Sequence, residues 1–240
     1  MLWQLKQCLG WAVQPQKLKA QSLKKEDARR EQLNSQQLEA EGQDTMEQQG
    51  GRLIRLDNGL PPQEFGEESR VAAVNIHENE AVLIVDYQVA GIPRSLWMPV
   101  CSGDIVPIGK NLHRVARVHY IPYTPPPGHT GGSQSHVLIG TTPIEQEGFS
   151  LHEDSLAIPL ETRTGIAGYY IEVLKLADST AKVETWPVGM AKSHTKPEQI
   201  HSHLAKAGNK LTLDSAQLNI LSVVPSNPQT GLRGFIEIGF

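Results

Sequence analysis

Cysteines, aromatic residues and long apolar runs are scarce in this chain. Its 240 residues include only two cysteines, Cys8 and Cys101, so we expect no disulfide framework and a reducing compartment. Aromatic residues account for 5%, which disfavours a surface on which nucleobases stack. No apolar run reaches the length of about 18 residues that a membrane-spanning helix requires, so no such helix is predicted.

An excess of basic charge and the common catalytic motifs are missing as well. The net charge is -4 and the pI is about 6.1, so no overall positive field would attract nucleic acid. No Gly-x-Ser-x-Gly motif occurs. The stretch from Gly103 to Lys110 ends like a phosphate-binding loop, but its spacing is one residue too long and strands are expected on both sides. We therefore predict no cofactor and no nucleic acid partner.

Residues 70–121 have the densest apolar content and alternate with a period of two. Residues 81–85 are continuously apolar, which is typical of a strand buried on both faces. Residues 85–89 and 115–121 alternate between apolar and polar side chains, and this spacing fits a pleated sheet better than a helix. Pro99 indicates that its strand lies at an edge.

A mainly β domain is predicted for residues 52–240, after a hinge at residues 49–51 (Gln-Gly-Gly). The expected architecture is a sandwich or a jelly-roll-like barrel built from short strands and tight turns. One short helix is expected near 197–207. Thr195 and Glu198 there have the spacing of a capping box, and Pro197 would occupy the first turn.

A helical arm is predicted for residues 1–51. Its first part places leucines on one stripe of a helical wheel, and Lys6 interrupts any signal-peptide core. We interpret this part either as an interfacial anchor on a membrane or as a helix that packs on a protein surface. Apolar residues from Leu18 to Leu38 then recur every five positions, which leaves no seam for a coiled coil.

The arm also divides its charges, because residues 17–30 are mostly basic and residues 31–49 are acidic. A basic run after an apolar start suits an anionic membrane surface, and a plain solvated arm is the alternative. Residues 1–30 are therefore the expected membrane-binding or partner-binding part. The residues predicted to make these contacts are Leu2, Leu5, Leu9, Lys17, Lys19, Lys24, Lys25, Arg29 and Arg30.

Histidines supply the weak candidates for an enzymatic site. Residues 122–136 form a loop rich in proline and glycine, and loops of this length are often functional. A catalytic metal needs three converging ligands, and nothing in the sequence dictates such convergence, so no metal site is predicted. The candidate acid, base or metal groups in and after the loop are His129, His136, His152 and Glu153.

Other residue pairs are weaker candidates for a catalytic or binding site. His201 and His203 lie two positions apart on the predicted helix, so they would point to different faces. Cys101 with His113 or His119 would make a nucleophilic dyad, but a buried, inert thiol is the preferred interpretation. Trp97 and Trp186 would serve a carbohydrate or peptide site, although apolar neighbours favour a place in the core.

The preferred hypothesis is a non-enzymatic structural or assembly protein. Its arm would dock on a partner or a membrane surface, and its β-domain would pack into an oligomer. By analogy of architecture alone, a virion, tail or secretion-type assembly would suit this layout, and the expected location is cytoplasmic or virion-associated. The alternatives are a hydrolase, metal-dependent or histidine-based, with its site at the loop 122–136, and a carbohydrate-binding or peptide-binding β-module.

Overall fold

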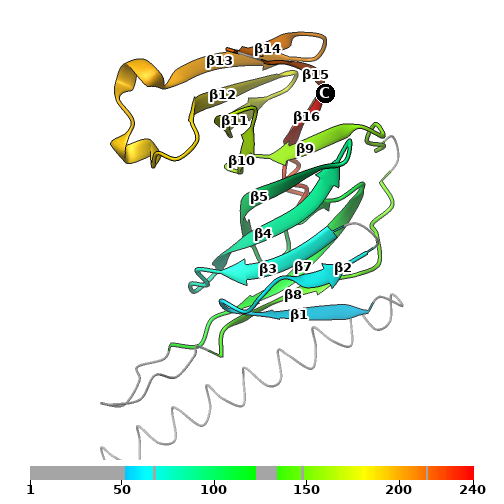
Figure 1. Cartoon of the computed structure of the whole chain (residues 1–240). Coiled ribbons are helices and arrows are strands. Elements are labelled where there is room, and N and C mark those ends of the chain that lie inside the picture. Colours follow the sequence, from blue (N-terminus) through cyan, green and yellow to red (C-terminus); the bar gives the residue numbers. More distant parts are fainter. Residues whose placement is uncertain (1–51, 67–68, 123–133, 147–148, 215) are drawn as a thin grey trace, which may run out of the picture. The chain divides into compact units, whose positions relative to one another are not determined.

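The structure, a computed structural model, describes residues 52–66, 69–122, 134–146, 149–214 and 216–240. In these residues nearly all regular structure is strand, so the mainly β class is confirmed (Figure 1). The strands are β1 (Leu53–Asp57), β2 (Gln63–Phe65), β3 (Ser69–Val74), β4 (Glu80–Val89), β5 (Ile92–Cys101), β6 (Ile105–Ile108), β7 (Asn111–His119), β8 (His136–Gly140), β9 (Ser155–Pro159), β10 (Arg163–Ile166), β11 (Tyr169–Ala177), β12 (Thr180–Pro187), β13 (His201–Lys206), β14 (Lys210–Leu213), β15 (Ala216–Val224) and β16 (Phe235–Gly239), with 3-10 turns η1 (Lys192–His194) and η2 (Pro197–Gln199).

The strands pair into antiparallel sheets. One four-stranded sheet has the order β1-β8-β7-β6, and a second has the order β14-β15-β16-β9. The largest sheet has eight strands in the order β13-β12-β11-β10-β5-β4-β3-β2. Each sheet is open at both ends within the described residues. The predicted antiparallel layers are therefore confirmed, whereas a closed, jelly-roll-like barrel is wrong.

A single large apolar core joins the eight-stranded sheet to both smaller sheets. In β4, Leu83 and Val85 are fully buried, while Val82 and Ile84 beside them are only partly buried, as strand alternation requires. The core combines the inner side chains of β3–β5 with those of β1, β7 and β8. It also combines the inner side chains of β11–β13 with those of β9 and β14–β16. The layers are thus sandwich-like.

The helix expected near 197–207 is wrong. Only the single 3-10 turn η2 forms there, and β13 follows it and pairs with β12 along its whole length. Thr195 does not cap a helix, because its hydroxyl donates to the carbonyl oxygen of Ala191 instead. The ladder with β12 therefore outweighs a local helix signal that is worth about 1 kcal/mol.

Pro99 lies in β5, which is an interior strand rather than an edge strand. Its neighbour β10 pairs with β5 only at Leu96 and Trp97, so Pro99 lies beyond the paired part. The missing N–H of Pro99 is thus accommodated where one side of β5 is open. Gly109 and Lys110 join strands β6 and β7 in a hairpin, so no helix follows them, in agreement with the prediction that this stretch is not a phosphate-binding loop.

The predicted arm, its hinge and most of the loop 122–136 lie outside the described residues. Among the residues that are described, no helix has the length and apolar character needed to cross a membrane.

Candidate functional site

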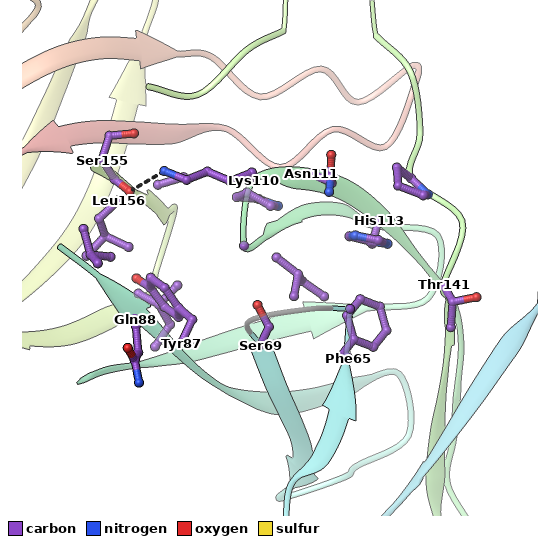
Figure 2. A pocket seen from close by; sticks show the side chains of 18 residues that line it. Phe65, Ser69, Tyr87, Gln88, Lys110, Asn111, His113, Thr141, Ser155 and Leu156 are labelled. Atoms are coloured by element: carbon purple, nitrogen blue, oxygen red, sulfur yellow. Dashed lines mark hydrogen bonds between the residues drawn. The ribbon is translucent and has the colours of Figure 1, made fainter. Parts of the chain in front are cut away.

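A cavity of about 440 Å³ is lined by residues of the eight-stranded sheet, the β6–β7 hairpin and β9 (Figure 2). Its apolar wall includes Phe65, Leu96, Ile108 and Leu156. A volume of this size lies within the range of about 300–1,000 Å³ that small-molecule sites occupy. Its polar side chains are Ser69, Tyr87, Gln88, Lys110, Asn111, His113, Thr141 and Ser155.

His113, on β7, presents a neutral imidazole to this cavity. Its Nδ1 lies 3.0 Å from the carbonyl oxygen of Gly140, which can only accept, so Nδ1 carries the proton. Burial lowers the pKa of His113 below its usual range, although the Gly140 carbonyl acts in the opposite direction. The ring also packs edge-on against Phe65, with 4.8 Å between centroids. Nε2 is therefore a fixed acceptor, and it makes no hydrogen bond with any described residue.

Tyr87, on β4, also lines this cavity, but its hydroxyl is buried in the protein. This hydroxyl has no hydrogen-bond partner among the described residues. Burial raises the pKa of Tyr87 above its usual range, against the opposing effect of Arg94 on the neighbouring strand. The phenol is therefore un-ionised and able both to donate and to accept. Ser69, on β3, is a buried residue that lines the same cavity, and its hydroxyl oxygen is not among the buried atoms without a partner.

Lys110 is the one charged side chain among the described lining residues, and its charge is already engaged. The ammonium donates to the carbonyl oxygens of His152 at 2.5 Å, of Ser155 at 3.4 Å, and of Glu153. These bonds hold the turn before β9 against the β6–β7 hairpin. The ammonium thus stabilises the wall and offers little free charge to the cavity.

Behind this turn lies a buried carboxylate, Glu237 on β16, whose side chain is 2% exposed. It accepts hydrogen bonds from the backbone N–H of His152 at 2.7 Å and from His152 Nδ1 at 2.8 Å. The hydroxyls of Ser155 and Ser222 donate at 2.6 Å and 3.0 Å. Desolvation raises the pKa of Glu237, but these hydrogen bonds outweigh it and lower the pKa below its usual range. Glu237 is therefore an ionised anchor for the turn.

The candidates predicted from the sequence do not converge. His129 lies outside the described residues. His136 stacks on His119 with 4.9 Å between ring centroids, whereas His152 binds Glu237 with its ring 66% exposed. Glu153 contributes a backbone carbonyl to Lys110. In the described part of the chain no three His, Cys, Asp or Glu side chains are placed to share a metal ion.

Two expectations about single pairs need correction. His201 and His203 lie on a strand, so they share a face instead of diverging, and His203 Nε2 lies 3.1 Å from the Thr185 hydroxyl oxygen. Cys101 is exposed rather than buried, and it lines a shallow hollow away from His113. Partial desolvation and the Asp104 carboxylate raise the pKa of Cys101, which leaves less of the nucleophilic thiolate.

A second candidate site lies on the outer face of the eight-stranded sheet. Consecutive strands there place five residues directly side by side, and we call them the transverse row: Ile84, Trp97, Arg163, Glu172 and Glu184. The Arg163 guanidinium lies 5.0 Å from the ring centroid of Trp97 and 5.0 Å from that of Tyr170. Trp97 is 44% exposed, so the expectation that it belongs to the core is wrong, whereas Trp186 is buried as expected.

The acidic end of the transverse row is neutralised within the chain. The Lys192 ammonium donates to Glu172 and lies 2.8 Å from a carboxylate oxygen of Glu184. The contact between Lys192 and Glu184 lowers the pKa of Glu184. Arg163, in contrast, forms no ion pair with any described residue. The row therefore presents an apolar half and an arginine that has no carboxylate partner in the part of the chain that the structure describes.

Sequence reasoning named Trp97 and His113 but missed Tyr87, Ser69, Arg163 and Glu237. Glu237 sits within the apolar run Phe-Ile-Glu-Ile of β16, and a lone carboxylate in a strand buried on both faces is a recognisable signal. Tyr87, Ser69 and His113 come from separate strands, and only the topology brings them together. Comparison of the chain with protein families, curated proteins and solved structures finds no match.

Proposed function

We propose that this protein is a non-enzymatic assembly protein whose β-domain binds a second copy of the chain through the transverse row. The observation that carries the proposal is the exposed Trp97, whose ring centroid lies 5.0 Å from the Arg163 guanidinium, with the Tyr170 centroid at 5.0 Å from the same group. Tryptophan, tyrosine and arginine are the residues that most often dominate the binding energy of protein interfaces. Val188 and Met190, which follow β12, are two further exposed apolar residues.

Charge favours a second copy as the occupant. Arg163 lacks a carboxylate partner among the described residues, and the chain as a whole has an excess of acidic over basic residues, 26 against 22. The turn between β3 and β4 carries Glu78, and Glu80 begins β4; both are exposed and in no ion pair within the described part, and we call them the acidic turn. This acidic turn is a complementary element that one copy can offer to Arg163 of another. Such a heterologous contact builds rings or filaments.

Residues 1–30 add a second attachment in this proposal, to a membrane surface or to a partner. The apolar stripe and the following basic run support it at the level of sequence. The hydrolase alternative has no support from geometry, since its described candidates do not meet. The binding-module alternative shares Trp97 with the proposal, so the experiment has to distinguish the two.

Sedimentation equilibrium of the full chain over micromolar concentrations tests the proposal. We expect a concentration-dependent oligomer for the wild type, and Trp97→Ala and Arg163→Ala should each weaken association at least tenfold, the effect of an interface hot spot. Leu204→Ala, another exposed apolar residue, lies on β13 outside both the transverse row and the acidic turn, so it is the matched control and should not change association. Circular dichroism checks that each variant is folded.

A charge exchange makes the test specific for the occupant. Arg163→Glu should abolish association, and Glu78→Lys with Glu80→Lys in the same chain should restore part of it. A wild type that stays monomeric at 100 times the concentration used for its purification would refute self-assembly. A monomer in which soluble oligosaccharides quench Trp97 fluorescence would favour the binding module instead.

A further inference from the structure

We propose that the end of the sheet formed by β11, β12 and β13 binds the surface of an anionic lipid membrane. These three strands are neighbours in the eight-stranded sheet (Figure 1). The contact surface consists of Lys175, Lys182, Leu204 and Lys206, which we call the lysine tip, and all four residues are exposed. This surface is separate from the transverse row and from residues 1–30.

The strand register places the lysine tip on one face of the sheet. Lys175 on β11 lies directly opposite Lys182 on β12, which in turn lies directly opposite Leu204 on β13. Lys206 follows Leu204 by two positions along β13, so its side chain leaves the strand on the same side. Ala205, between them, is buried in the core. The alternation therefore turns the lysine tip away from the core.

The positive charge of the lysine tip is only partly compensated within the chain. Lys175 and Lys206 form no ion pair with any described residue. Lys182 lies 3.5 Å from a carboxylate oxygen of Glu184, but that carboxylate also pairs with another lysine. Asp178, in the turn between β11 and β12, adds a single carboxylate beside the three lysines. The tip therefore keeps a net positive charge.

The pair Lys175–Lys182 indicates that this charge has a use outside the fold. Side chains directly opposite each other on antiparallel strands have Cβ atoms about 4.5–5.5 Å apart, and like charges at this spacing destabilise the sheet. Since no described carboxylate lies against Lys175, the fold gains nothing from placing a second lysine there. An anionic partner over the tip would relieve the repulsion.

The exposed leucine identifies the partner as a lipid surface. Leu204 is 72% exposed, the largest exposed fraction among the large apolar residues that the structure describes. The interface of a membrane takes up such an aliphatic side chain while neighbouring lysine stems extend to the headgroups. The tip contains neither arginine nor an aromatic residue, which would grip phosphates bidentately or stack on bases in a nucleic acid site.

The expected strength follows from this composition. Each lysine close to an anionic bilayer strengthens binding about fivefold. Partial burial of the Leu204 side chain adds a factor of about five. Together the four residues should give a partition constant on the order of 10³ M⁻¹, which is below that of a single myristoyl chain. The lysine tip is therefore a reversible contact that is measurable at millimolar lipid concentrations.

Co-sedimentation of the full chain with vesicles tests the proposal. The wild type should bind mixed phosphatidylcholine and phosphatidylserine vesicles at least about tenfold more tightly than pure phosphatidylcholine vesicles. Lys175→Gln combined with Lys182→Gln should weaken binding to the mixed vesicles at least about tenfold. Leu204→Ser should weaken it about fivefold. Lys175→Arg combined with Lys182→Arg keeps both charges and should stay within about twofold of the wild type.

Lys196→Gln is the matched control. Lys196 is an exposed lysine in the connection between β12 and β13, at the opposite end of both strands from the lysine tip. Charges more than about 8 Å from the bilayer are largely screened at physiological salt, so this variant should change binding less than about twofold. Circular dichroism checks folding, and Lys175→Gln should melt no lower than the wild type, because it removes a repulsion.

Four results would overturn the proposal. A wild type that ignores the mixed vesicles would show that the tip binds no lipid. Unchanged binding of the lysine and leucine variants would leave residues 1–30 as the membrane contact. An equal loss in Lys196→Gln and Lys182→Gln would show general charge attraction. Lysine variants that lose affinity for a short DNA duplex but not for vesicles would reassign the tip to nucleic acid. The assembly proposal is tested by sedimentation without lipid, so the two proposals fail separately.

Discussion

Replacing Glu237 with glutamine removes one charge from the interior and keeps the shape of the side chain. The carboxylate accepts hydrogen bonds from the His152 backbone, the His152 ring, Ser155 and Ser222, at 2.6–3.0 Å. A hydrogen bond to a charged group contributes about 1 kcal/mol more than a neutral one. Across these bonds the loss would reach about 4 kcal/mol, and the relief of burying a charge offsets part of it. We expect a net destabilisation of about 2 kcal/mol.

Urea denaturation and thermal melting of the full chain at pH 7 measure this effect. For a protein of this size, 2 kcal/mol corresponds to a fall in Tm of about 4–8 °C. Glu161→Gln is the matched control, because Glu161 is an exposed carboxylate that pairs with Arg233 at 2.7 Å. Because the Glu161 side chain is 63% exposed, its pair with Arg233 contributes only about 0–1 kcal/mol, and this variant should melt near the wild type.

The stabilising effect of the Glu237 carboxylate should also depend on pH, and its direction follows from the lowered pKa. Because the pKa of Glu237 is lowered in the folded state, its stabilisation is complete above the ordinary carboxyl pKa of 4.5 and is lost as the pH falls through the folded-state value. The difference between wild type and Glu237→Gln should therefore shrink below about pH 4.5. A glutamine variant as stable as the wild type at pH 7, or a difference that stays constant in acid, would refute the account of Glu237 as an ionised anchor.

Three further outcomes are expected. Gly231→Ala should destabilise the fold by at least about 2 kcal/mol in urea denaturation, because φ is +82° and a Cβ would lie 2.5 Å from the Gly103 carbonyl oxygen. Gly208→Ala, at φ +83° in open space, should cost only about 1 kcal/mol, and equal costs for the two variants would contradict this reasoning. Lys110→Met should lower the free energy of unfolding by about 1–2 kcal/mol in the same assay, because the hydrogen bonds to the backbone carbonyls are lost. An unchanged denaturation midpoint would show that these contacts do not stabilise the fold. Glu at positions 17, 19, 24 and 25 should reduce co-sedimentation with phosphatidylserine vesicles at least a hundredfold, and unchanged binding would exclude the basic run as a membrane contact.

The strands were predictable because a period of two reports burial directly. The apolar–polar alternation of residues 85–89 and 115–121 predicted strands there, and both lie in strands. Residues 81–85 were expected to be buried on both faces, but Val82 and Ile84 are only partly buried. The helix predicted for residues 197–207 was wrong for the opposite reason. Its helix signal is local, whereas the pairing of β13 with β12 involves residues about 20 positions away along the chain.

The sites were less predictable than the strands. Tyr87 and Ser69 look like ordinary members of alternating strands, and nothing in the local sequence shows that a cavity separates them from β9. Trp97 lies in an apolar run, but strand alternation turns it to the outer face, opposite Arg163. Glu237 was missed too, although its apolar neighbours Phe235, Ile236 and Ile238 are a signal that could have singled it out.

The junction between β5 and β10 has a mechanical consequence. Four strands lie on each side of it, yet the two sets are joined only by the pairs Leu96–Thr164 and Trp97–Arg163, together with a hydrogen bond of 3.0 Å from the Thr164 hydroxyl to the Ser95 carbonyl. So short a ladder resists bending less than the long ladders beside it. Trp97 and Arg163 occupy this junction, so a molecule bound over them would stiffen the sheet where it yields most easily.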